Sequence, residues 1–136
     1  MSEYSIREVS QMFHIPASTL RYYEEEGILT NVAKNTSGQR VYTQGHINRL
    51  ATIFCFKRTG MTIAQLKDFF AYEEDEAGHI KDILNLLEEQ KDYVFEQMRQ
   101  LEKDYEHVQR KLRYYSAISQ ALDEGKPRPC WDDYRE

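Results

Sequence analysis

The feature that most constrains the fold is a long heptad repeat in the second half of the chain. From about His79 to Glu124 the sequence contains no proline or glycine. Alternating steps of four and three residues from Ile80 meet apolar or aromatic side chains, interrupted only by Lys91 and Ser119. This period predicts one coiled-coil helix, roughly 65–70 Å long at about 1.5 Å per residue.

A single helix of this kind would expose a long apolar stripe to water, so it requires a partner strand. For one chain, a symmetric homodimer is the simplest arrangement that covers the stripe. We therefore predict that the heptad residues make the dimer contact, namely Leu84, Leu87, Val94, Met98, Leu101, Tyr105, Val108, Leu112 and Tyr115.

The amino-terminal part of the chain carries the signals of two short helices joined by a tight turn. Ser5 and Glu8 have the spacing of a capping box, and apolar residues follow at helical spacing as far as Phe13. Pro16 suits the start of a second helix, and Gly27 suits the position just after its end. Two such helices form a helix-turn-helix, whose second helix enters the major groove of DNA.

The expected second helix carries polar groups suited to DNA. Arg21, Tyr22 and Tyr23 stand together before an acidic run. Arginine forks onto phosphates or guanine edges, and tyrosine hydroxyls donate to phosphates. Ser18 and Thr19 lie at the leading end, where short hydroxyls reach bases. The alternative is a solvated amphipathic helix with no partner.

The next segment reads as a small hairpin followed by two helices. Turn residues surround Gly38, and Arg40 and Tyr42 share one face of the strand by the two-residue period. A third helix begins at Thr43 and a fourth is capped by Thr62. Their predicted apolar stripes are Ile47, Leu50, Ala51 and Phe54 in the third helix, and Ile63, Leu66, Phe69 and Phe70 in the fourth.

These segments together resemble the DNA-binding head of the MerR family of bacterial transcription regulators. The resemblance is close over about residues 4–72. Residues 19–29 resemble the recognition helix of the family, residues 34–42 its first wing and residues 57–63 its second wing.

The resemblance implies roles for individual side chains. Arg21 would read a base or a phosphate, and the phosphate clamps would be Tyr22, Arg40, Tyr42 and Lys57 or Arg58. One departure concerns the start of the third helix, where Gly45 and His46 stand in place of the usual acidic residues. We expect this to weaken the first turn by up to about 1 kcal/mol.

The resemblance also implies how the whole chain is organised. We expect a mainly α fold with a winged helix-turn-helix head at residues 1–73, a dimerising coiled-coil helix at 79–124 and a tail at 125–136. The paired helices would run antiparallel and hold two heads on a near-palindromic promoter site. By kinking and undertwisting an overlong spacer, the dimer would align the promoter for RNA polymerase. No cofactor is expected.

Charge and composition agree with this expectation. The net charge is −5, but residues 1–70 carry 8 basic and 6 acidic side chains, whereas residues 71–136 carry 10 and 17. The head is therefore weakly basic and can face phosphates while the acidic half points away. The sequence has no long apolar run and no signal peptide, which predicts a cytoplasmic protein with two free cysteine thiols and no membrane partner.

Several features of the chain could receive the signal that controls such a regulator, and Cys55 is one candidate. Its position just before the second wing resembles the branch of the family that responds to aldehydes and other thiol-reactive electrophiles. The neighbouring Lys57 and Arg58 would favour the thiolate. The alternative is that Cys55 is a small buried hydrophobe beside the third helix.

Three further possibilities concern the later part of the chain. A metal signal would need more ligands than His79 and Cys130 supply, so no metal site is predicted. A small apolar ligand could lie among the tail, the coiled coil and three aromatic residues, Phe69, Phe70 and Tyr72, although aromatic residues there more often form core. Cys130 beside Trp131 could be a second redox thiol or anchor a folded-back tail, but we expect a frayed tail.

No catalytic motif is present in the sequence, so we do not expect an enzyme. The rival from another functional class is a coiled-coil interaction module with a degenerate head that binds protein. That reading explains the long helix but leaves Arg21, Tyr22, Arg40 and Tyr42 without a role.

Overall fold

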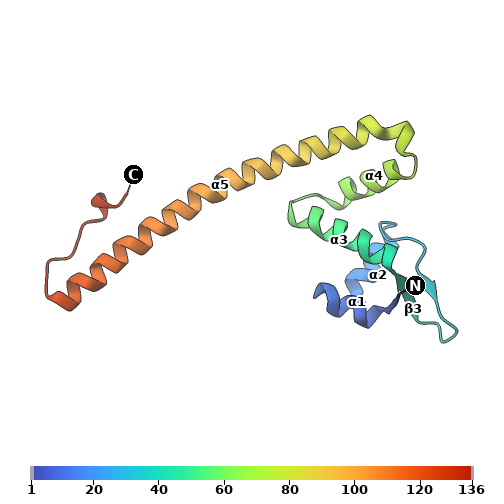
Figure 1. Ribbon diagram of the computed structural model, residues 1–136, viewed down its shortest axis with the longest axis horizontal. Coiled ribbons are helices and arrows are strands. Elements are labelled where there is room, and N and C mark those ends of the chain that lie inside the picture. Colours follow the sequence, from blue (N-terminus) through green and yellow to red (C-terminus); the bar gives the residue numbers. More distant parts are fainter. Residues whose placement is uncertain (1, 136) are drawn as a thin grey trace. The chain divides into compact units, whose positions relative to one another are not determined.

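A computed structural model describes residues 2–135, which form two compact units that divide between Gln90 and Lys91 (Figure 1). The first unit holds every element up to the first turns of the long helix α5 (Glu76–Glu124). The second unit holds the rest of α5 and the tail. The first unit therefore extends beyond the head expected at residues 1–73, because the beginning of α5 packs onto that head.

The first two helices agree with the sequence prediction. Helix α1 spans Ile6–Phe13 and α2 spans Ala17–Glu25, directly after Pro16. The capping box of α1 is complete, since the Ser5 hydroxyl accepts from the Glu8 amide at 3.1 Å and the Glu8 carboxylate accepts from the Ser5 amide at 3.0 Å. Gly27 follows α2 with a φ of +76°, a conformation that glycine adopts without strain.

Three short strands form an antiparallel sheet beside these helices. They are β1 (Glu3–Ser5), β2 (Ala33–Lys34) and β3 (Arg40–Thr43), in the order β1-β3-β2. Tyr4 lies opposite Tyr42, and Lys34 lies opposite Arg40. The hairpin formed by β2 and β3 was predicted, whereas β1 was not, because three residues are too few to show a strand period.

Helix α3 spans Gln44–Arg58 and α4 spans Ile63–Glu73. At the start of α3, where we expected a weakened first turn, His46 supplies the cap that the usual acidic residue would supply. Its Nδ1 accepts from the amide of Thr43 at 2.9 Å, and its Nε2 lies 2.8 Å from the carbonyl oxygen of Thr30. The buried imidazole thus completes a capping box and ties α3 to the loop before β2.

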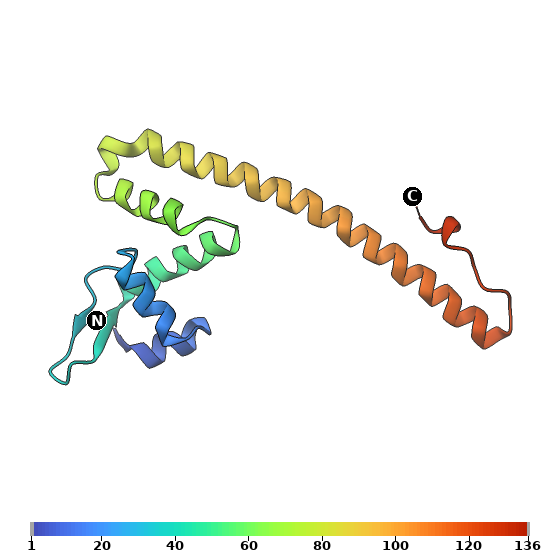
Figure 2. The same cartoon turned by 180° about the vertical axis from the view of Figure 1, so that it is seen from behind.

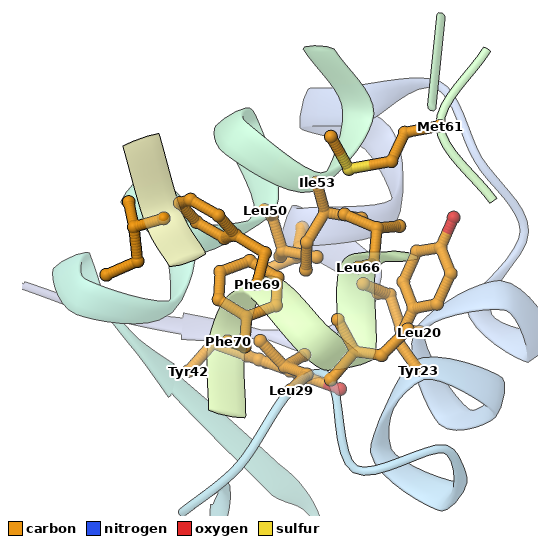
Figure 3. Close-up of a cluster of buried hydrophobic side chains, with 13 residues drawn as sticks. Leu20, Tyr23, Leu29, Tyr42, Leu50, Ile53, Met61, Leu66, Phe69 and Phe70 are labelled. Carbon is orange, nitrogen blue, oxygen red and sulfur yellow. The ribbon is translucent and has the colours of Figure 1, made fainter. Parts of the chain in front are cut away.

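The core of the first unit lies between α2, β3, α3 and α4 (Figure 3). Leu20, Leu50 and Leu66 are fully buried in it. The predicted stripe of α3 is wrong at one position, since Ala51 is exposed and Ile53 is buried instead. The buried members are Val9, Leu20, Tyr23, Ile28, Leu29, Tyr42, Leu50, Ile53, Met61, Leu66, Phe69, Phe70 and Ile83.

Helix α5 spans Glu76–Glu124 and is the long helix that the heptad predicted. His79 has non-helical backbone angles, φ −126° and ψ 19°, so the regular helix begins after it. Leu86 and Leu87 pack against the core of the first unit. Within residues 2–135, none of the helices combines the length and apolar character needed to cross a membrane.

The tail of the second unit is ordered, which corrects the expectation of a frayed end. After Gly125 the chain turns back along the last part of α5 and forms a short 3₁₀ helix, η1 (Trp131–Asp133) (Figure 2). The ring centroids of Trp131 and Tyr114 lie 5.3 Å apart, and the Nζ of Lys111 lies 3.8 Å from the centroid of the Trp131 ring. Aromatic packing and a cation–π contact therefore hold the tail on α5.

Candidate nucleic-acid interface

Helix α2 presents polar side chains on one side because its apolar residues fix the other. Leu20 and Tyr23 are buried in the core and set the rotation of the helix. Arg21 and Tyr22 are exposed as a result, with Tyr22 42% accessible. At the leading end of the helix Ser18 is exposed and Thr19 is half-buried.

An ion pair connects the wing to this helix. The Nε of Arg40 on β3 lies 2.6 Å from the Oε2 of Glu24 on α2, and both side chains are half-buried. At the tip of the wing the side-chain oxygen of Asn35 accepts from the amides of Ser37 and Gln39, each at 3.0 Å. These contacts fix the tip of the hairpin and tie the first residue of β3 to α2.

Tyr42 lies elsewhere than the sequence predicted. Its side chain is fully buried, so it is not available to clamp a phosphate. The two-residue period places Arg40 and Tyr42 on the same face of β3, but Tyr42 lies over the core whereas Arg40 reaches Glu24 at the edge. Burial is the main cause that raises the pKa of Tyr42, the charge of Glu24 raises it further, and Arg40 and Arg21 lower it.

A cleft of about 400 Å³ lies beside the wing. It is lined by residues 5–7 at the start of α1, by Arg21 of α2 and by residues 38–40 of the wing. Arg7 is the functional candidate that sequence reasoning missed. The signal was its place in the first turn of α1, just after the cap residue Ser5, but a single exposed arginine is common on helices.

The second predicted wing follows α3. Lys57 and Arg58 occupy the last turn of α3, and both are exposed. Thr59 ends the helix and Gly60 follows with a φ of +94°. The side-chain amide of Gln90 on α5 donates to the carbonyl and hydroxyl oxygens of Thr59. Lys57 and Arg58 therefore lie directly before a turn that is hydrogen-bonded to α5.

Cys55 is exposed on α3, one turn before Thr59. The expectation of a small buried hydrophobe is thus wrong, since the side chains that fill the core from this helix are Leu50 and Ile53. For the same reason, an adduct on Cys55 would not be resisted by a packed core in this unit. Cys130 is also exposed.

His79 and the aromatic residues near it have structural partners. Its Nδ1 lies 3.0 Å from a carboxylate oxygen of Asp82, and its ring stacks on Tyr72 with a centroid separation of 5.1 Å. Phe69 and Phe70 belong to the core. Across residues 2–135, no three His, Cys, Asp or Glu side chains gather closely enough to hold a metal ion.

The heptad residues of α5 are mostly exposed in the single chain. Leu101 is 69% accessible and Val108 is 63% accessible, values that are unusual for such large apolar side chains. Leu84, Met98, Tyr105, Leu112 and Tyr115 are exposed in the same way. Leu87 and Val94 are half-buried, and Leu87 packs on the first unit.

Comparison with known proteins gives one consistent result. Residues 4–73 match the family model described as MerR HTH family regulatory protein. An uncharacterised HTH-type transcriptional regulator of Haemophilus influenzae is 30% identical over 112 residues, which cover 82% of this chain and 83% of that protein. The HTH-type transcriptional regulator CueR of Escherichia coli O157:H7 is 23% identical over 126 residues, covering 93% and 88%.

A solved structure agrees with these sequence relatives. HiNmlR is described as a MerR family regulator lacking the sensor domain, bound to promoter DNA. Its fold matches with a TM-score of 0.81 and 29% identity, over 92% of each chain. Each of these relatives is named as a regulator rather than as an enzyme, in agreement with the sequence prediction.

Proposed function

Because the chain belongs to the MerR HTH family of regulatory proteins, we propose that it binds promoter DNA as a homodimer and so regulates transcription. The observation that carries this proposal is the exposed Arg21 on α2, which lines one cleft together with Arg40 of the wing. HiNmlR, which shares the fold over nearly its whole length, binds promoter DNA.

In this proposal α2 enters the major groove and the wings contact the backbone beside it. Arg21 reads a base edge or a phosphate, and Tyr22 donates to a phosphate. Ser18 and Thr19 lie at the end of the helix that enters first. Outside α2, the residues proposed to contact phosphates are Arg40 and Lys57 or Arg58. Tyr42 is not included, because it is buried.

The exposed heptad face of α5 supports dimerisation. An apolar stripe over many turns is costly in water, and a second copy carries an identical stripe that covers it. The contact residues proposed are those of the heptad, with its middle at Leu101.

The charges of α5 support an antiparallel orientation of the two helices. Residues 82–96 carry five acidic side chains and one lysine, a net −4, whereas residues 106–120 carry three basic and one acidic, a net +2. Pairing that is antiparallel about Leu101 places these segments opposite each other. Parallel pairing would place each segment against its own like charge, which is unfavourable.

An antiparallel dimer presents two α2 helices to one face of a near-palindromic site. We further propose that the dimer kinks and undertwists the promoter spacer, so that RNA polymerase finds its two elements in register. The protein would then act in the cytoplasm, where bacterial promoters lie.

The test is selection of duplexes from a random pool, followed by titration at several salt concentrations. The proposal expects one enriched, nearly two-fold symmetric sequence and an affinity that falls steeply as salt rises. If no sequence is enriched and the protein does not bind duplex DNA at low salt, the rival interaction module takes the place of this proposal.

For the controlling signal we propose a thiol-reactive electrophile that acts on Cys55. The thiol is exposed and lies one turn before Thr59, next to the basic residues of the second wing. Addition of the sulfur to an aldehyde carbon would form a hemithioacetal, with the thiol proton passing to the former carbonyl oxygen. The added group would alter the surface of α3 beside Lys57 and Arg58 rather than push apart a core.

This signal is tested by mass spectrometry and a promoter reporter together. Cys55 is expected to react with a small aldehyde or iodoacetamide, and Cys55→Ser is expected to lose induction while it still binds DNA. Because Cys130 is also exposed, Cys130→Ser is the matched control and should respond normally. A Cys55→Ser variant that still responds would exclude the thiol signal.

The other signals have less support. Phe69 and Phe70 pack in the core, so they do not line an open apolar ligand site. A metal signal would need ligands beyond His79 and Cys130, and His79 already pairs with Asp82.

A further inference from the structure

We propose that the cleft between α1, α2 and the wing binds one backbone phosphodiester of duplex DNA, and that Arg7 is a direct contact to it. This inference rests on the proposed function, and it assigns a site and a residue that lie outside the recognition helix.

The first argument is charge. Arg7, Arg21 and Arg40 all line the same cleft, and none of the residues that line it is acidic. Glu24 offsets one of these charges through its ion pair with Arg40. Two guanidinium charges remain, and their mutual repulsion is relieved by an anion between them.

The second argument is the number of hydrogen-bond donors. A guanidinium presents five N–H groups in a planar fork that matches two oxygens of a phosphate. The pair with Glu24 engages the Nε of Arg40, so the terminal nitrogens of that side chain still carry donors for a ligand. Arg7 and Arg21 are exposed and can turn toward the same anion.

The third argument is the backbone of α1. The capping box engages the amides of Ser5 and Glu8. Ile6 and Arg7 lie in the first turn, where the helix itself supplies no acceptor for an amide. Both residues line the cleft, so the positive end of the α1 dipole adds to the charge of the arginines.

The position of the cleft favours a phosphodiester within a DNA strand. Its volume is about 400 Å³, and its walls belong to α2 and the wing, the two elements proposed to grip DNA. Gly38 at the tip of the wing has a φ of +79° and nothing within 4 Å of the place where a Cβ would be. The wing is thus open to a strand that passes over it.

The experiment compares wild type, Arg7→Ala and Arg7→Lys on two duplexes, one selected by the protein and one of random sequence. Arg7→Ala is expected to bind both duplexes about three- to tenfold more weakly, with a salt slope reduced by about one. Arg7→Lys should keep the slope and recover part of the affinity, because it keeps the charge but loses the fork. Lys81→Ala, an exposed change on α5, is the matched control and should bind as wild type does.

A second measurement locates the phosphate. Single methylphosphonate substitutions, which remove one backbone charge each, are scanned across the selected duplex. One position in each half-site should weaken wild type but leave Arg7→Ala unaffected. Equal sensitivity of the two proteins at every position would overturn the proposal, as would unchanged affinity and slope for Arg7→Ala.

The two possible failures differ. If wild type itself binds neither duplex, the proposed function fails. If wild type binds and Arg7→Ala binds equally well, only the cleft assignment fails. Inorganic phosphate without DNA distinguishes the other source of the anion. If Arg7→Ala binds both duplexes as wild type does, but phosphate at constant ionic strength raises the thermal midpoint of wild type and not of Arg7→Ala, the cleft is a site for free phosphate and the assignment to DNA is overturned.

Discussion

The side-chain amide of Gln90 donates to both the backbone carbonyl oxygen and the hydroxyl of Thr59, each at 2.9 Å. Gln90 lies on α5, and Thr59 ends α3 directly after Lys57 and Arg58. One polar contact therefore joins the helix proposed to dimerise to the turn proposed to touch DNA. A shift of α5 at this point would move the second wing.

Removal of this contact should destabilise the head. Gln90→Ala leaves the carbonyl and hydroxyl of a half-buried Thr59 without these two donors, and should lower the free energy of unfolding by about 1–2 kcal/mol. Urea denaturation measures the change. Gln100→Ala is the control, because Gln100 donates to Asp104 on the exposed surface of the same helix and its loss should cost little. If the two variants lowered the free energy of unfolding equally, the Gln90 contact would contribute no more than an exposed hydrogen bond.

Tyr42→Phe is expected to leave DNA binding unchanged, because the side chain is buried away from the interface. Among the described residues, no group accepts from or donates to its hydroxyl. The variant should therefore be as stable as wild type, or more stable by up to about 1 kcal/mol. An affinity for DNA that falls with this change would restore the phosphate contact expected from the sequence.

Alkaline pH gives a second readout of the same side chain. Burial raises the pKa of Tyr42 above its ordinary value of 10.0, so the folded protein keeps the proton when the unfolded chain has begun to lose it. The part of the free energy of unfolding that depends on the protonation of Tyr42 is fully present below pH 10. It is lost as pH rises through the folded pKa. Tyr42→Phe should therefore make the loss of stability above pH 10 shallower, whereas exposed Tyr93→Phe should not.

Much of this fold was predictable from local patterns, and the exceptions have physical reasons. Caps at Ser5 and Thr62 and the heptad of α5 depend on neighbouring residues in the sequence, so they could be read directly. The burial of Tyr42 could not, because a two-residue period tells which residues share a face and not which of them lies over the core. The contact of His46 with Thr30 could not be read either, because this partner lies sixteen residues away in the sequence.

The interface was predictable only in part. The exposure of Arg21 and Tyr22 could be predicted, because a charged and a polar side chain stand together on a short helix with an apolar side. The shared cleft of Arg7 and Arg40 could not be predicted, because Arg40 lies 33 residues later in the sequence. Trp131 was expected in a frayed tail because an apolar residue near a terminus has no local partner, and Tyr114 supplies one only after the chain reverses.

Charging the middle of the heptad should separate the dimer. Leu101→Glu combined with Val108→Glu places unpaired carboxylates in the proposed contact, which is strongly unfavourable when they are buried. Sedimentation should show a monomer, and DNA affinity should fall because one head loses the effective concentration supplied by the other. The variant with Gln100→Glu and Lys103→Glu should remain a dimer, because both changes lie at exposed positions that are not among the proposed contact residues. A Leu101/Val108 double variant that is still dimeric would mean that the contact lies elsewhere.

The folded-back tail can be followed by fluorescence, because Trp131 is the single tryptophan of the chain. Tyr114→Ala removes the ring on which Trp131 and Tyr134 pack. The emission of Trp131 should move to longer wavelength as the indole enters water. Tyr93→Ala changes an exposed residue of α5 that lies far from the tail in the sequence, so it should leave the spectrum unchanged. An unchanged spectrum for Tyr114→Ala would contradict the packed tail.

The most direct test of the central claim is the affinity of Arg21→Ala for the duplex that the wild-type protein selects. Arg21 is exposed on α2, between the buried residues Leu20 and Tyr23 that set the rotation of the helix. If α2 reads the major groove, this substitution should cost about 1–3 kcal/mol of binding free energy and relax the sequence preference at one position in each half-site. Wild-type affinity and preference in Arg21→Ala would contradict the account, since α2 would then not be the recognition helix.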